Sequence, residues 1–291
     1  MKHIHIENIF DYTEVKPPYF ALANLSLNDD DSLSAFIPIQ QPLDLEVGYI
    51  SAAESGRHLA ILGACSVAIF NPKKEKHYYL AYKAEFHNKF FQHNPEDLNY
   101  VYGVSKGHLI NKRTAVSESS LFHPNGNVIN ILKTYYHVIA EKSFKKIYKN
   151  FKISTNFNES VNPYTILFPI KNVCISEKNL TASLGAISPN SCAGHFPNFP
   201  ALPVAILSST LSRAAGYLLK NILNQYDLKY IICEVILKAD NLAFAGEIVI
   251  LEVEYLNSNT NGYVFCCKAI ANLQKEVANL HIILSPINQY Y

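Results

Sequence analysis

The sequence predicts an α+β protein built from two similar halves, each with one long central helix and a set of antiparallel strands. Small and apolar residues recur at helical spacing over residues 46–65 and again over 203–224. Each helical segment is followed by several apolar and aromatic runs bounded by turn residues, which is typical of strands. The chain of 291 residues has room for two domains of about 100–150 residues each.

The first half begins with an expected strand at 17–27 and a proline-containing loop at 36–45. The helix over 46–65 ends before Asn71-Pro72, because proline cannot continue a helix. A turn at Lys106-Gly107 separates two of the strands that follow. We expect these strands at 77–86, 98–104, 108–116 and 127–140. A short polar helix at 141–150 begins the connection to the second half, so the predicted domains are 1–150 and 151–291.

The second half repeats this order of elements. Two strands are expected at its start, over 165–175 and 179–187. A loop rich in Pro and Gly over 188–203 then leads into the helix at 203–224. Four further strands are expected at 228–239, 246–256, 263–273 and 276–284.

Composition excludes several classes of function. The 25 basic and 24 acidic residues give a net charge of +1, which does not favour nucleic acid as a partner. No apolar run approaches the ~18 residues of a membrane-spanning helix, and the N-terminus has no secretory pattern. The six cysteines show no zinc-like spacing, so we expect packing roles for them and no metal site. These features predict a cytoplasmic protein that binds no membrane.

The loop before the second helix carries the most informative motif. It reads Gly194-His195-Phe196-Pro197, then Asn198 to Pro203, and a largely apolar helix follows. This pattern resembles the signature of the hotdog-fold 3-hydroxyacyl-carrier-protein dehydratases. In that family, a strand sheet wraps a central helix, and the loop histidine is the catalytic base. The resemblance therefore implies a double hotdog, with His195 as a catalytic residue.

The resemblance also implies an acidic partner fourteen positions after the histidine, but that position is Ser209 here. The first helix carries Glu54, and the position fourteen residues before it is Gln40. Each half thus lacks what the other has, as expected of a fused pseudo-dimer with one working site. We expect His195 and Glu54 to meet there. The alternatives are that His195 is an ordinary loop or core residue and that Glu54 lies on a solvated helix face.

The dehydratase resemblance assigns further roles to residues around these two. His195 would remove the C2 proton, while Glu54 would protonate the departing hydroxyl. His58, one turn beyond Glu54, could tune it, act itself or only pack. Backbone N–H groups near the expected helix start would polarise the thioester carbonyl. The expected substrate-binding residues are Gly48, Tyr49, His58, Gly194 and Phe196.

The expected function is therefore dehydration of a 3-hydroxyacyl thioester in fatty-acid or polyketide-type biosynthesis. An acyl carrier protein is the expected partner, and no cofactor is expected, because the substrate is carried on phosphopantetheine of that protein or of coenzyme A. The alternatives are a hotdog acyl thioesterase and a non-catalytic acyl-binding subunit. The quaternary structure could be a monomeric pseudo-dimer or a homo-oligomer of it.

Overall fold

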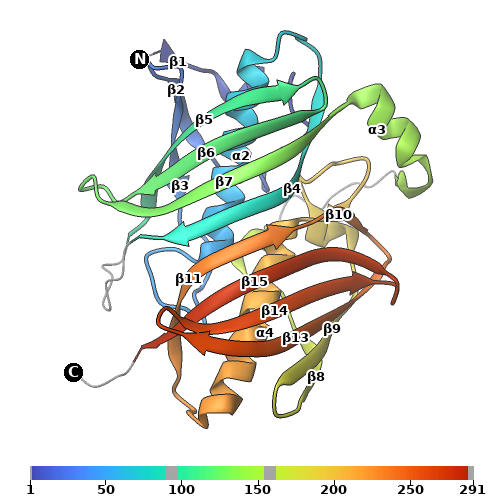
Figure 1. The fold of residues 1–291 in the computed structure, drawn as a ribbon. Coiled ribbons are helices and arrows are strands. Elements are labelled where there is room, and N and C mark those ends of the chain that lie inside the picture. The colour runs from blue at the N-terminus through green and yellow to red at the C-terminus, as the bar shows by residue number, and fades with distance from the viewer. Residues whose placement is uncertain (1, 90–97, 154–161, 288–291) are drawn as a thin grey trace.

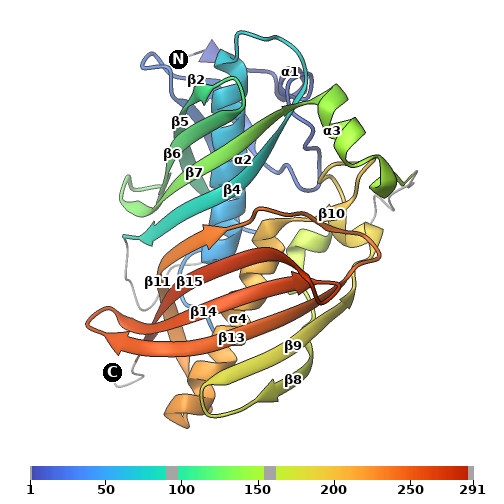
Figure 2. The same ribbon diagram turned by 45° about the vertical axis from the view of Figure 1, so that its right-hand side comes forward.

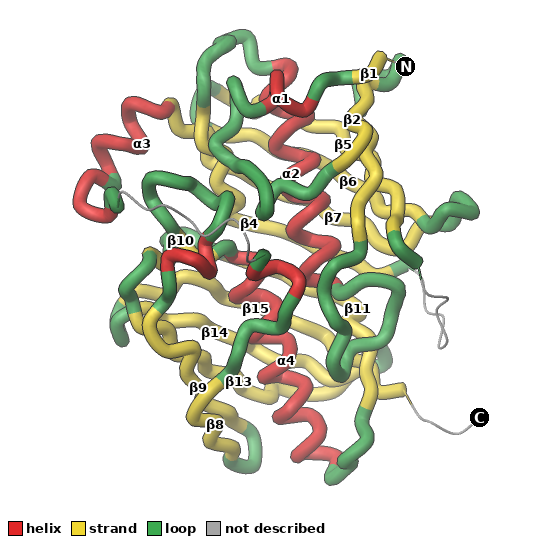
Figure 3. The backbone as a smooth tube through the Cα atoms, turned by 180° about the vertical axis from the view of Figure 1, so that it is seen from behind, coloured by secondary structure: helices red, strands yellow, loops and turns green. Residues whose placement is uncertain are grey.

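Two long helices, each packed on antiparallel strands, organise the structure (Figure 1). The computed structural model describes residues 2–89, 98–153 and 162–287. Helix α2 spans Ala52–Phe70 in the first half, and helix α4 spans Val204–Leu223 in the second. Seen from behind, both helices lie on the same side of the strands (Figure 3). The described residues also form two short α-helices, α1 Ile6–Ile9 and α3 Glu141–Ile147, and three 3-10 helices, at Lys149–Phe151, Pro163–Thr165 and Pro189–Cys192.

The strands divide between the halves as the sequence predicts. Those of the first half are β1 Lys2–His3, β2 Ala23–Leu27, β3 Leu33–Pro38, β4 His77–Asn88, β5 Tyr100–Asn111, β6 Thr114–Phe122 and β7 Val128–Ala140. Those of the second half are β8 Lys171–Ile175, β9 Asn179–Ala186, β10 Ala201–Leu202, β11 Lys229–Lys238, β12 Ala243–Phe244, β13 Ile248–Asn259, β14 Gly262–Ala271 and β15 Lys275–Ile287. The domain division at residue 150 stays a prediction, and residues 154–161 of the expected connection lie outside the described residues.

The two halves share one strand order. In the first half the order is β3-β5-β6-β7-β4, and in the second it is β9-β13-β14-β15-β11. In each half, the strand that follows the long helix in the chain lies at the end of this spatial order. These two strands, β4 and β11, pair antiparallel over Lys83–His87 and Glu234–Lys238. The two half-sheets thus join into one sheet of 13 strands, and Figure 2 shows β4 and β11 side by side at its middle.

Close contact between each long helix and its sheet depends on glycine. A Cβ added to Gly216 of α4 would lie 2.3 Å from the ring of Tyr230 on β11, which is fully buried. A Cβ on Gly107 of β5 would lie 2.7 Å from Val67 of α2. Real Cβ atoms do not approach so closely, so glycine lets helix and strand pack at these points.

Several predicted boundaries are wrong for identifiable reasons. Lys106-Gly107 is no turn: β5 runs through it, because Gly107 provides room for α2, and the chain turns after Asn111 instead. Helix α2 begins at Ala52 rather than 46, since Ser51 is its N-cap and Glu46 pairs with Tyr230 of the second half. Two strand starts are also displaced, since β2 begins at Ala23 and β8 at Lys171. Strand β3 was not predicted, and its end at Pro38 extends into the expected loop.

Within the described residues, no helix is long and apolar enough to cross a membrane. The cytoplasmic location stays a prediction.

The glycine contact leads to a stability prediction. We expect Gly216→Ala to lower the free energy of unfolding by about 1–3 kcal/mol, because its Cβ would overlap the Tyr230 ring. The control is Gly56→Ala in α2, where an added Cβ would have no atom within 4 Å. That change should raise stability by up to about 1 kcal/mol through helix propensity. Urea unfolding of both variants tests this, and equal stability would contradict the packing argument.

Candidate active site

A cavity of about 200 Å³ lies where the two halves meet. One wall is a face of α2 that carries mostly small residues at helical spacing: Ala53, Gly56, Arg57, Ala60 and Ala64. The opposite wall is the first turns of α4, with Val204, Ala205 and Ser208. Apolar side chains of β4, β7 and β11 complete it, including Phe86, Leu132 and Leu237. The cavity is therefore a largely apolar space that neither half could form alone.

The His195 loop is held over this cavity by the N-terminal segment. Gly194 accepts a hydrogen bond from Lys16 N at 2.8 Å, and Val15 pairs with His195 as an antiparallel bridge. Gly194 has φ of +75°, and a Cβ there would lie 2.2 Å from the carbonyl oxygen of Lys16. Both observations require glycine. The predicted motif thus serves to place its histidine at the cavity.

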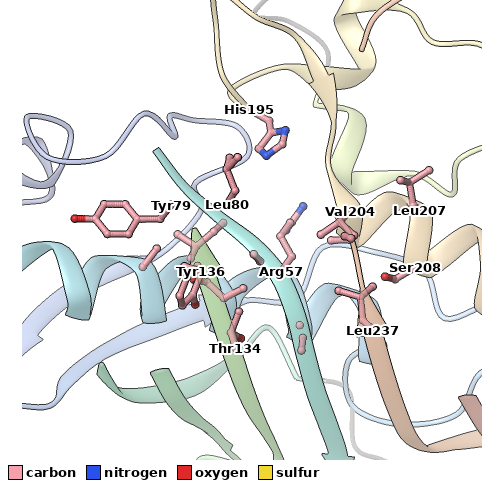
Figure 4. A pocket seen from close by; sticks show the side chains of 18 of the residues that line it. Arg57, Tyr79, Leu80, Thr134, Tyr136, His195, Val204, Leu207, Ser208 and Leu237 are labelled. Atoms are coloured by element: carbon pink, nitrogen blue, oxygen red, sulfur yellow. The ribbon is translucent and has the colours of Figure 1, made fainter. Parts of the chain in front are cut away.

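The imidazole of His195 is fixed in one tautomer. Its Nδ1 lies 2.8 Å from the carbonyl oxygen of Ala201. A carbonyl only accepts hydrogen bonds, so Nδ1 carries the proton and Nε2 presents its lone pair. Burial lowers the pKa of His195 to about 4, although the bond to Ala201 acts in the opposite direction. At neutral pH the ring is therefore uncharged, and Nε2 can accept a proton. Figure 4 shows the ring at the edge of the cavity.

Glu54 lies in a different environment from the one expected. Its two carboxylate oxygens accept hydrogen bonds from Gln40 N at 2.8 Å and Gln41 N at 3.1 Å. It is 1% exposed and is not among the described residues that line the cavity. Among the described contacts, no hydrogen bond or ion pair joins it to His195. In this structure Glu54 ties the loop after β3 to the first turn of α2, and its pairing with His195 in a reaction stays a prediction.

His58 is a buried, neutral neighbour of Glu54. Its Nε2 lies 2.8 Å from Nη2 of Arg57. An arginine only donates, so this Nε2 accepts, and His58 is uncharged. Burial first, and the Arg57 charge second, lower the pKa of His58 to about 4. The 3.6 Å approach of His58 to Glu54 is therefore not an ion pair at neutral pH.

The remaining predicted substrate contacts fall in two places. Phe196 lines the large cavity and stacks on His195, with ring centres 4.0 Å apart. Gly48 and Tyr49 line another cavity of about 10 Å³ beside the start of α2. That volume is about enough for one water molecule. Among the backbone N–H groups near the expected helix start, which the prediction assigned to the thioester carbonyl, that of Val47 is bonded to Tyr230 O at 2.9 Å. The roles of Gly48, Tyr49 and Gly194 in substrate binding stay predictions.

Arg57 is the cavity residue that sequence reasoning missed. Its guanidinium is 2% exposed and packs over the Tyr164 ring, with Cζ 4.9 Å from the ring centre. Figure 4 shows the side chains of Arg57 and His195 extending toward the same space from opposite sides. An arginine beside a glutamate in a helix ordinarily indicates a solvated face, so no local pattern marked it as buried.

This chain is similar to known proteins in structure and not in sequence. No family model matches the sequence, and no curated protein matches it. Among solved structures, an acyl-CoA thioesterase II from Mycobacterium marinum is 11% identical over 99% of this chain and 100% of its own, with a TM-score of 0.55. A 12:0-ACP thioesterase from Umbellularia californica is 8% identical over 94% of this chain and 100% of its own, with a TM-score of 0.58.

A third similar structure, a protein of unknown function from Alicyclobacillus acidocaldarius, is described as having a hot dog fold. It is 7% identical over 91% of this chain and 96% of its own, with a TM-score of 0.51. The chain has the double hotdog fold. That part of the sequence prediction is confirmed, since two helix-wrapping halves are joined edge to edge.

The comparisons contradict the predicted dehydratase, and with it the lyase in fatty-acid or polyketide biosynthesis. The similar structures are mostly described as thioesterases. The geometry agrees with this correction: dehydration needs an acid beside the base, and the Glu54 oxygens are bonded to the backbone of Gln40 and Gln41. The histidine motif indicated how the loop is built, and it did not specify the reaction.

The cysteine nearest to His195 in the sequence does not have an activated thiol. Cys192, three residues before His195, is buried, and burial raises the pKa of its thiol. A protonated thiol is a poor nucleophile. No group of three or more His, Cys, Asp or Glu residues could hold a metal ion among the described residues.

Two of the buried histidines, His58 and His195, make stability depend on pH. In the unfolded chain a histidine pKa is about 6.5, whereas burial lowers both His58 and His195 to about 4. Between these values the unfolded state binds more protons, so the free energy of unfolding falls as the pH falls. Each histidine should contribute up to about 1.4 kcal/mol per pH unit. Urea unfolding between pH 5 and 6.5 should give a shallower slope for His58→Gln than for the wild type. Equal slopes would show that folding does not lower the pKa of His58.

Proposed function

We propose that this double hotdog hydrolyses acyl thioesters. The observation that carries the proposal is the tautomer of His195, which presents an unprotonated Nε2 to an apolar cavity between the two central helices. The similar thioesterase structures support the same activity. An apolar cavity suits an acyl chain, and a neutral imidazole suits the activation of water.

In the proposed reaction, His195 takes up one proton from water and later gives it to the leaving group. Nε2 takes a proton from a water molecule as the water oxygen forms a bond to the thioester carbonyl carbon. The carbonyl oxygen becomes an oxyanion. When the intermediate collapses, the carbon–sulfur bond breaks and the imidazolium returns its proton to the leaving thiolate. The products are a carboxylic acid and a thiol.

The first turn of α4 is suited to stabilise that oxyanion. Val204 and Ala205 line the cavity directly after the His195 loop. A helix leaves its first N–H groups without intrahelical partners, and its dipole places partial positive charge there. Such preorganised donors stabilise a developing oxyanion. This arrangement takes both the base and the oxyanion donors from the second half, and the acyl-binding wall from α2 of the first.

The carrier is proposed from the comparisons alone. One similar structure is described as acting on acyl-CoA and another on acyl-ACP. Both carriers present the thioester on phosphopantetheine, so the chemistry at His195 would be the same. We propose this shared arm as the leaving group. Docking of an acyl carrier protein stays a prediction.

Substitution of His195 tests the activity. We expect the wild type to release thiol from octanoyl-CoA, and His195→Gln to lower kcat/KM by about 10²–10⁴-fold, the usual contribution of a general base. The matched control is His281→Gln, an exposed histidine on β15. Thiol release followed with a chromogenic disulfide measures both. A wild type without thiol release, or an unimpaired His195→Gln, would contradict the proposal.

The pH profile provides an independent check on the same residue. The base must be unprotonated, and the pKa of His195 is lowered to about 4 by burial. Thus kcat/KM should stay level as the pH falls from neutral toward 5 and decline only as it approaches 4. A decline centred near 6.5, the ordinary histidine value, would show that the cavity does not desolvate the ring.

A further inference from the structure

The most unusual group in the cavity wall is the guanidinium of Arg57. Its Nη2 is bonded to Gln40 Oε1 at 2.6 Å and lies 2.8 Å from His58 Nε2. Its Nε and Nη1 have no hydrogen-bond partner among the described residues, although the residue is 2% exposed. Buried donors without acceptors are costly, more so when the group is charged. A position that keeps such donors is suited to an acceptor supplied by a ligand.

Arg213 of α4 shows the contrasting case of a purely structural arginine. All three of its side-chain nitrogens are used: Nε by Asp44 at 2.9 Å, Nη1 by Phe168 O at 2.7 Å, and Nη2 by the Tyr217 hydroxyl at 3.1 Å. It joins the two halves and leaves no donor nitrogen free. Arg57 differs because its two remaining nitrogens belong to a side chain that lines the cavity.

The charge of Arg57 is only partly balanced by the protein. Oε1 of Glu54 lies 3.7 Å from Nη2, beyond hydrogen-bond length, and both Glu54 oxygens are held by backbone N–H groups. His58 is neutral, so it adds no positive charge. An anionic oxygen entering the cavity would therefore form charge-assisted hydrogen bonds in a poorly solvated place, where they are strong.

The surroundings of Arg57 indicate the class of ligand. A Cβ at Gly56 would meet nothing within 4 Å, so space adjoins the arginine. The walls beyond it are apolar, with Ala60, Ala64, Leu132 and Leu237 among them. Among the described residues that line the cavity, Arg57 is the only Lys or Arg, while Glu14 and Asp240 also line it. One cation among apolar and acidic residues suits a singly charged head on an apolar chain, rather than a phosphate.

We propose that the cavity binds a fatty-acid carboxylate, with its head group on Nε and Nη1 of Arg57 and its chain along the apolar walls. This inference concerns equilibrium binding and does not depend on hydrolysis, although the same anion is what thioester hydrolysis would release. It makes Arg57 a ligand-binding residue opposite His195.

The test compares octanoate with octan-1-ol, which has the same chain length and no charge. Isothermal titration at neutral pH should show that the wild type binds octanoate at least about tenfold more tightly, the usual gain from a hydrogen bond to a charged group. Arg57→Gln should bind the two ligands with similar affinity. Arg57→Lys, which keeps the positive charge, should retain most of the preference.

Equal affinity of the wild type for the two ligands, or an undiminished preference in Arg57→Gln, would overturn the inference. If a thermal melt shows that Arg57→Gln does not fold, Arg57→Met, which removes the charge and keeps an unbranched side chain, takes its place, and the wild-type pair of ligands still tests the preference. The proposed hydrolysis fails separately: a wild type that prefers octanoate but releases no thiol retains this inference and loses the proposed function. A wild type that releases thiol but does not prefer octanoate retains the proposed function and loses this inference.

Discussion

The antiparallel pairing of β4 with β11 is the constraint on which the site depends. It joins the two half-sheets over Lys83–His87 and Glu234–Lys238, and it sets α2 and α4 against each other on one side of the sheet. The His195 loop then reaches the N-terminal segment, where Gly194 accepts from Lys16. Neither half alone contains both Arg57 and His195, so the cavity exists because the two edges pair. Small residues on α2 leave that space unfilled, since Gly56, Ala60 and Ala64 cannot reach across it.

Much of this fold was predictable because repetition is a strong signal in a sequence. Two helical segments, each followed by strands, predicted two similar halves, and the position of α4 was correct to within a residue at each end. In the structure His195 lines the cavity, and its catalytic role stays a prediction. The errors came where tertiary contacts override local pattern. Lys106-Gly107 has the composition of a turn, but Gly107 lies in a strand because α2 packs on it. Residues 46–51 have helical composition, but Glu46 and Val47 pair with Tyr230 of the second half.

The chemistry was less predictable than the fold. Counting positions linked Glu54 to His195, but counting does not show which way a helix faces. Glu54 is bonded to the loop after β3, whereas Gly56 and Arg57, two and three residues further along the same helix, line the cavity. The free donors of Arg57 are a property of three-dimensional packing. Reading them from the sequence would require knowing that Gln40 and His58 engage one nitrogen and leave two.

The two cavities described above differ in volume, about 200 Å³ between α2 and α4 and about 10 Å³ at the start of α2, and this has a consequence for how the chain can change. In a homodimer of single hotdogs, every substitution appears twice, so a residue that improves one cavity also alters its symmetric copy. Joining the halves in one polypeptide removes that coupling. The segment around Asp44 binds Arg213 and Lys229, whereas its counterpart around His195 lines the larger cavity. After duplication, one half of a protein can therefore specialise in stabilising the fold while the other specialises in binding a ligand.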